Sequence, residues 1–125
     1  MAFRENLPAQ CPPDDAADVS YPSLWRLVAA QQVAAEDFDS HAKQGKTPPN
    51  KSVDLCRWAS CSFFTSKARV KDLVALPKMR AKYSWAVEVS VPAGAGVSKS
   101  HNAHVDLWMW ASFDPVSAVV GVAQV

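Results

Sequence analysis

The sequence has little excess charge, few glycines, few cysteines and no long apolar run. Thirteen Lys and Arg against twelve Asp and Glu leave a net charge of +1, which as a whole-chain value favours neither nucleic-acid binding nor an acidic tail. Every apolar run is far shorter than the roughly 20 residues of a membrane-spanning helix. Residues 1–18 lack the apolar centre of a signal peptide. We therefore predict a soluble, cytoplasmic protein with no membrane contact.

Only four glycines are present, and none builds a nucleotide-binding motif. The Gly45-Lys46-Thr47 sequence lacks the glycine five residues earlier that a phosphate-binding loop needs, because Ser40 is there. The Gly94-Ala-Gly96 sequence lacks the third glycine and the following helix of a dinucleotide-binding turn. We interpret it as a turn, and we predict no cofactor.

The sequence has three cysteines, Cys11, Cys56 and Cys61, which are too few for a disulfide-dense scaffold and cannot all be paired within the chain. Any single bridge leaves one thiol free. A reducing interior is the simpler assumption, and we expect reduced thiols.

A chain of 125 residues with 49% hydrophobic and 20% charged residues matches one globular domain. Residues 1–20 contain Pro8, Pro12 and Pro13, which cannot continue a helix, and they lack strand periodicity. We predict an extended N-terminal arm over 1–20 and a single α+β domain over 21–125. This fold class is a single small domain with two helices packed on a largely antiparallel sheet of three to four strands.

The hydrophobic spacing predicts the elements of this domain. Three- and four-residue spacings indicate a helix within 23–42, and a second stripe indicates a helix over 67–76, capped by Ser66 and ended by Pro77. The apolar segment 55–66 is ambiguous, with a strand favoured. Alternation predicts strands over 83–91 and 105–110, and β-rich composition predicts a paired strand over 118–125.

The charges are strongly partitioned along the chain. Residues 1–42 carry two basic and seven acidic side chains, residues 43–82 carry ten and two, and residues 83–125 carry one and three. The middle segment therefore has a net charge of +8, and it includes Trp58 and two phenylalanines. Cations interleaved with aromatic rings are typical of single-stranded nucleic-acid binding. We predict that a phosphate-bearing ligand, a nucleic acid or a nucleotide, binds at Arg57, Trp58, Lys67, Arg69, Lys71, Lys78, Arg80 and Lys82. The alternative is a solvated basic face.

A second hypothesis is a small enzyme acting on phosphodiesters or nucleotides, and the sequence leaves open whether the protein is an enzyme. His101 and His104 follow a glycine-bearing turn and precede a strand that carries Asp106. A histidine pair with a carboxylate can divide general-acid and general-base roles, and His41 adds a third imidazole. This set fits a metal-independent, ribonuclease-like reaction in which a cation stabilises the charged phosphorane. The alternative is that these are ordinary exposed loop residues.

Two further hypotheses use other residues. A zinc site is one alternative, formed by Cys56, Cys61, His101 and His104, although the spacings are looser than in common zinc modules. A protein-interaction domain is the other, with a homodimer or another protein as partner. In that case the exposed contact is formed by Trp108 and Trp110.

Overall fold

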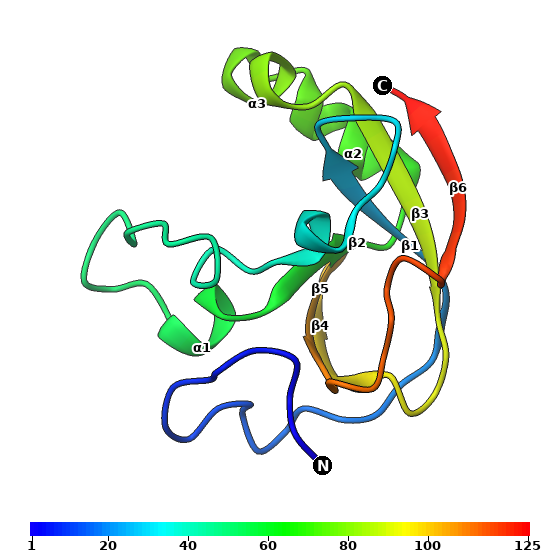
Figure 1. Ribbon diagram of the computed structural model, residues 1–125. Coiled ribbons are helices and arrows are strands. Elements are labelled where there is room, and N and C mark those ends of the chain that lie inside the picture. The colour runs from blue at the N-terminus through cyan, green and yellow to red at the C-terminus, as the bar shows by residue number, and fades with distance from the viewer.

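A six-stranded antiparallel β-sheet organises the computed structural model, which describes all residues from 1 to 125 (Figure 1). The strands are β1 (Tyr21–Val28), β2 (Cys61–Phe64), β3 (Trp85–Val91), β4 (Gly96–His101), β5 (His104–Met109) and β6 (Val119–Gln124), and they lie in the order β4-β5-β2-β1-β3-β6. Three short α-helices are α1 (Leu55–Trp58), α2 (Lys67–Val74) and α3 (Pro77–Lys82), and a 3₁₀ helix spans Ala35–Phe38. No helix has the length and hydrophobicity that crossing a bilayer requires. The α+β class and the antiparallel sheet are confirmed, whereas the expected numbers of helices and strands are too low.

Both faces of the sheet are covered. Leu24 and Val28 of β1 belong to the larger core, which also contains Phe38 from the 3₁₀ helix. Leu27 points to the opposite face, where it packs with Val70 of α2 in a smaller core. Figure 1 shows α2 and α3 together at one end of the sheet, with α1 and the long loop before it at the side of β2 and β5.

The predicted helix over 23–42 is wrong, because β1 occupies its first third. β1 lies between β2 and β3, and strands in the middle of a sheet that is covered on both faces lose the simple apolar alternation. The segment after β1 is not helical over its whole length, and hydrogen bonds from Arg26 stabilise it. Its guanidinium donates to three backbone carbonyls, those of Asp37 and Ser62 at 2.8 Å and that of Asp39 at 3.2 Å.

The ambiguous segment 55–66 forms two elements rather than one strand. Asp54 begins α1 by accepting hydrogen bonds from the backbone N–H groups of Cys56 and Arg57. After one turn the chain enters β2, which pairs with β5. The helix over 67–76 is confirmed as α2, with Ser66 as its N-cap. Pro77 follows the end of α2, and it is also the first residue of α3.

The strands predicted over 83–91, 105–110 and 118–125 are confirmed as β3, β5 and β6. β4 was not predicted. It pairs with β5 to form a hairpin whose turn consists of Asn102 and Ala103, and Asn102 has the left-handed φ of 54° that such turns favour. His101 and His104 are therefore direct cross-strand partners and not members of a loose loop.

The N-terminal arm follows the edge of the sheet without forming a regular element. Ala17 exchanges two backbone hydrogen bonds with Ser98 of β4, at 2.8 and 2.9 Å. A disulfide joins Cys11 to Cys56 at the start of α1, and Cys61 is the free cysteine. The expectation of reduced thiols is therefore wrong for two of the three cysteines. The cytoplasmic location remains a prediction, and a structural disulfide is more common in oxidising compartments.

Candidate functional site at the β4–β5 hairpin

A buried carboxylate, Asp106, lies at the centre of the candidate site. Side chains alternate along β5, so Val105, Leu107 and Met109 point into the larger core. Asp106, which lies between Val105 and Leu107, therefore points to the opposite face. Asp106 is only 1% exposed there. A buried charge is costly without partners, and the sequence supplies several from distant segments.

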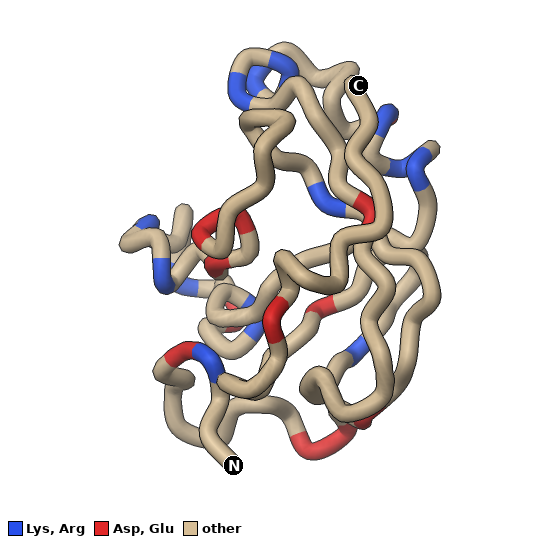
Figure 2. Tube along the Cα trace, turned by 45° about the vertical axis from the view of Figure 1, so that its right-hand side comes forward, with Lys and Arg blue, Asp and Glu red and all other residues tan.

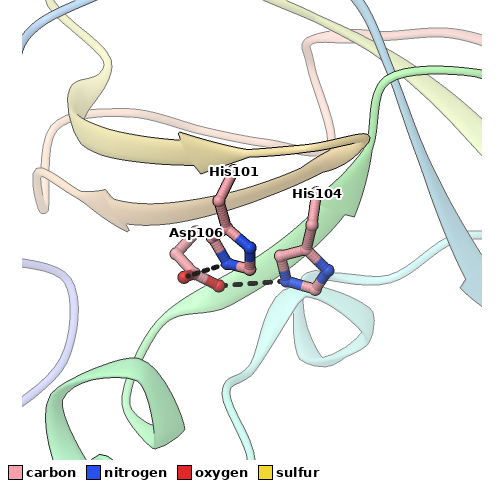
Figure 3. A group of neighbouring side chains, drawn as sticks. All are labelled: His101, His104 and Asp106. Carbon is pink, nitrogen blue, oxygen red and sulfur yellow. Dashed lines mark hydrogen bonds and ion pairs between the residues drawn. The ribbon is translucent and has the colours of Figure 1, made fainter.

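Four side chains converge on the two oxygens of this carboxylate. On Oδ1, the Nε2 atom of His104 lies at 3.0 Å and Ser60 Oγ at 3.3 Å. On Oδ2, Arg57 Nε donates a 2.9 Å hydrogen bond and His101 Nε2 lies at 3.6 Å. Figure 3 shows both imidazoles directed at the carboxylate from the hairpin end. Burial alone would raise the pKa of Asp106, but the hydrogen bond with His104 and the charge of Arg57 outweigh it and lower the pKa below its usual value.

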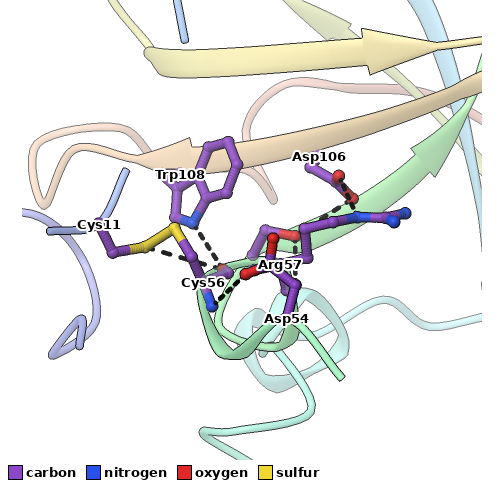
Figure 4. The surroundings of a disulfide bond; sticks show 7 residues. Cys11, Asp54, Cys56, Arg57, Asp106 and Trp108 are labelled. Atoms are coloured by element: carbon purple, nitrogen blue, oxygen red, sulfur yellow. Dashed lines mark hydrogen bonds and ion pairs between the residues drawn. A yellow bond between two sulfur atoms is a disulfide. The ribbon is translucent and has the colours of Figure 1, made fainter. Parts of the chain in front are cut away.

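Arg57 reaches Asp106 because α1 is fixed on several sides (Figure 4). A four-residue helix is not stable by itself. The disulfide holds Cys56 to the arm, and the indole N–H of Trp108 donates to the carbonyl oxygen of Cys56 at 3.0 Å. Asp54 caps the first turn. The position of the guanidinium therefore depends on contacts far away in sequence.

Three open hollows adjoin this cluster. One, of about 400 Å³, is lined by residues of the loop before α1, by Arg57 and Trp58, and by His41, His104 and Asp106. A second, of about 270 Å³, contains Arg57, His101, Asp106 and Lys99. The third, of about 410 Å³, lies between α2 and the hairpin turn and includes Arg69, His101 and His104. Side chains of the cluster are therefore accessible to a ligand although the carboxylate itself is buried.

His41 lines the hollow of about 400 Å³, which we call the α1 hollow, and three positive charges act on its imidazole there. The His41 ring packs on Trp58 with 4.4 Å between ring centroids, and the Trp58 indole N–H donates to the carbonyl of Lys46 at 3.0 Å. Loss of hydration lowers the pKa of His41, and the positive charges of Lys46, Arg26 and Lys82 lower it further. The repulsion felt by a protonated His41 is the attraction that an anion would experience at the same place.

The structure brings most of the predicted catalytic residues together. His101, His104 and Asp106 form one contact cluster with Arg57, and His41 and Trp58 line the α1 hollow beside them. Sequence reasoning missed Ser60, for which no signal existed, because only the pairing of β2 with β5 brings it to Asp106.

The remaining predicted cations are dispersed. Figure 2 shows the basic residues of α3 at one end of the molecule and those of the loop before α1 at another. Lys67 lies over the Trp25 ring, 5.7 Å from its centroid, and Arg69 lines the hollow beside α2. None of Lys71, Lys78, Arg80 and Lys82 lines the three hollows at the cluster. The cations of segment 43–82 therefore do not all line one hollow, and their joint role in binding a ligand stays a prediction.

Two predicted sets of residues require correction. The zinc site of Cys56, Cys61, His101 and His104 is wrong, because Cys56 is bonded to Cys11 and Cys61 is buried. Burial also raises the pKa of the Cys61 thiol, so the thiolate is disfavoured.

The tryptophan contact surface is wrong for Trp108, which is only 2% exposed. Trp110 is half-buried and stacks on Phe3, with 4.2 Å between ring centroids. The two tryptophans therefore hold α1 and the N-terminal arm in place. Comparison of the chain with models of protein families, with curated proteins and with solved structures finds no match.

Proposed function

We propose that the protein binds a phosphate-bearing ligand, a nucleotide or a segment of single-stranded nucleic acid, in the α1 hollow. The observation that carries this proposal is the convergence of Arg57, His41 and His104 on one hollow next to an aromatic ring. Phosphate oxygens are acceptors of charge-assisted hydrogen bonds, and guanidinium and imidazole groups are suitable donors.

Arg57 has donors to spare for such a ligand. Its bond to Asp106 uses Nε, and no protein group accepts a hydrogen bond from its Nη atoms. The side chain is 49% exposed, so these N–H groups are accessible. Asp106 thus acts as a positioning residue, because it fixes the guanidinium plane and leaves the outer donors for the ligand.

The negative charges in the α1 hollow are already engaged. Asp54 accepts the first two backbone hydrogen bonds of α1, and Asp106 is surrounded by its four partners. Lys46 adds a positive charge close to His41. Trp58, packed against His41, supplies an aromatic surface next to these donors.

The test is a titration of the oxidised protein with labelled oligouridylate and with AMP at several salt concentrations. If phosphates are bound, affinity falls as salt rises, and Arg57→Gln weakens binding by about tenfold or more, as expected for hydrogen bonds to charged groups. Arg80→Gln, on α3 and outside the hollow, is the matched control and should change affinity little. A flat salt response, or equal losses for the two variants, would contradict the proposal.

A second candidate function, phosphodiester cleavage, is favoured by one specific observation. His104 is oriented by Asp106 and lines the same hollow as His41, whose lowered pKa suits a general base. In this reaction His41 takes the proton of a ribose 2′-hydroxyl and the 2′-oxygen bonds to phosphorus. The bond from phosphorus to the 5′-oxygen then breaks, and His104 protonates that leaving oxygen. Arg57 stabilises the charge of the phosphorane.

Cleavage is measured with a fluorogenic RNA dinucleotide. His41→Ala and His104→Ala should each lower kcat by about 10²- to 10⁴-fold, the usual contribution of general acid–base groups. Lys78→Ala on α3 serves as the control for loss of a positive or polar side chain outside the hollow. Absence of turnover in the unmodified protein would remove the enzyme candidate and leave the binding proposal in place.

A further inference from the structure

We propose that His101, His104 and Asp106 form a binding site for one divalent transition-metal ion of the zinc class. The inference goes beyond the proposed function, since binding of a phosphate in the α1 hollow needs no metal. It rests on the geometry of three donor atoms, on the rigidity of their support and on the hydrogen bonds behind the carboxylate.

The donor atoms already converge. The Nε2 atoms of His104 and His101 lie 3.0 and 3.6 Å from oxygens of Asp106, and the three donor atoms all lie within 4.8 Å of one another. Ligands bound tetrahedrally at about 2.1 Å from zinc are about 3.4 Å apart. Both distances are close to this value, and they run to different oxygens of Asp106. A common ion would therefore be bound by both carboxylate oxygens, or one imidazole would rotate towards the oxygen that the other one contacts.

The hairpin supports these donors rigidly. His101 and His104 are paired across β4 and β5, and their rings stack with centroids 5.1 Å apart and planes inclined by 22°. Asp106 is two residues further along β5, which places its side chain on the same face as that of His104. The turn between the histidines contains only Asn102 and Ala103, so their relative position is fixed by backbone pairing.

Other residues orient the carboxylate from behind. Arg57 Nε donates to Oδ2 of Asp106 at 2.9 Å, and Ser60 Oγ, whose single hydrogen is shared with the carbonyl oxygen of Arg57, lies 3.3 Å from Oδ1. Hydrogen-bonded carboxylates of this kind are usual around metal ions, because the outer partners fix the direction of the ligand lone pairs. The positive charge of Arg57 opposes a cation, and the negative charge of Asp106, which Arg57 Nε contacts at 2.9 Å, offsets part of this repulsion.

Two imidazole nitrogens with one carboxylate leave coordination positions open for water or an exogenous ligand. Such positions would face the hollows that adjoin the cluster, including the α1 hollow. A metal-bound phosphate oxygen would then be shared with Arg57. A metal ion on Nε2 would also replace the hydrogen bond to Asp106 that orients His104, and it would prevent the ring from carrying a second proton, so this site and proton transfer by His104 exclude each other.

The inference is tested on the full, oxidised chain after removal of metals with a chelator. We expect calorimetric titration with Zn²⁺ to show one ion per chain. Titration with Co²⁺ should give visible absorption of a nitrogen and oxygen site without a thiolate band. His101→Asn and His104→Asn should each weaken Zn²⁺ binding by more than about 100-fold, since loss of outer partners alone costs 10- to 100-fold.

His41→Asn is the matched control, because it removes the one histidine outside the metal cluster, and it should leave Zn²⁺ affinity unchanged. The outcome that overturns the inference is a Zn²⁺ dissociation constant weaker than about 100 µM. An equal loss of affinity in His41→Asn, or a thiolate band with Co²⁺, also overturns it. His101 is exposed, so His101→Asn keeps the test valid if His104→Asn fails to fold.

The oligouridylate titration of the chelated protein separates this inference from the proposed function. Unchanged RNA binding together with absent Zn²⁺ binding removes the metal site alone. Zn²⁺ binding together with absent RNA binding removes the proposed function alone.

Discussion

Removing the disulfide between Cys11 and Cys56 should destabilise the protein strongly. The bond closes a loop over a sequence separation of 45 residues, which includes the second half of the N-terminal arm, β1 and the 3₁₀ helix. The double variant Cys11→Ser/Cys56→Ser leaves the native contacts of the arm in place, including both backbone hydrogen bonds between Ala17 and Ser98. Its main effect is therefore on the unfolded chain, which gains the freedom of an open loop.

The loop length sets the magnitude of this effect. In the chain-entropy relation, a loop of this size costs the unfolded state an entropy of about 13 cal/mol/K, which corresponds to about 4 kcal/mol at 25 °C. The total stability of domains of this kind is about 5–15 kcal/mol. The variant should therefore lose a large part of its free energy of unfolding and lie close to its unfolding transition at physiological temperature.

Urea denaturation followed by tryptophan fluorescence measures this difference. Thiol titration in denaturant should first detect one free thiol per oxidised chain, that of Cys61, and three after reduction. Adding a reductant to the double variant is the control and should change nothing. A loss smaller than about 1 kcal/mol would refute the loop-closure reasoning, since it would mean that the bridge hardly restricts the unfolded chain.

Three further predictions concern single residues. The folded-state pKa of Asp106 is lowered, so its stabilisation is present above about pH 4, the usual range of Asp, and is lost as the pH falls through the folded pKa. In urea titrations at a series of pH values, the free energy of unfolding of Asp106→Asn should therefore fall less at acid pH than that of the unmodified protein. An equal fall in both proteins would contradict this cause. Gly96→Ala would place a Cβ 2.9 Å from a Cα of β5 and should cost about 1–3 kcal/mol, whereas Gly121→Ala meets an ordinary 3.6 Å contact and should be tolerated. Equal midpoints of urea unfolding for these two variants would contradict this cost and would show that β4 can move away from β5. Arg26→Met removes three hydrogen bonds to carbonyls and should cost about 2–4 kcal/mol, against about 0.5 kcal/mol or less for Arg69→Met on the surface of α2; equal thermal midpoints would contradict the role of Arg26.

Local sequence signals were sufficient where one face of an element is apolar. β3 alternates around Val87 and Val89, and α2 has a clear cap at Ser66 and a buried stripe at Val70. β1 was missed because it lies in the middle of the sheet and buries residues on both faces. Leu24, Leu27 and Val28 happen to have helical spacing, yet they belong to two different cores.

The site could be predicted in part. His101, His104 and Asp106 are close in sequence, and a hairpin brings close residues together, so proximity was a usable signal. Its charge is the only sequence signal at Arg57, and nothing in the sequence connects this residue with Asp106. The link requires β2 to pair with β5 and α1 to be held by the disulfide. The same contacts exclude Cys56 as a metal ligand.

The sequence by itself determined the fold class, the elements with one-sided hydrophobic patterns and the residue types of the candidate site. These features depend on local propensity and on the periodicity of apolar residues, which a linear chain carries directly. The tertiary structure alone decided the strand order, the pairing of Cys11 with Cys56 and the four partners of Asp106. Such contacts join segments up to 70 residues apart, as in the pairing of Tyr21 with Val91, and they follow from burying a common core and compensating a buried charge.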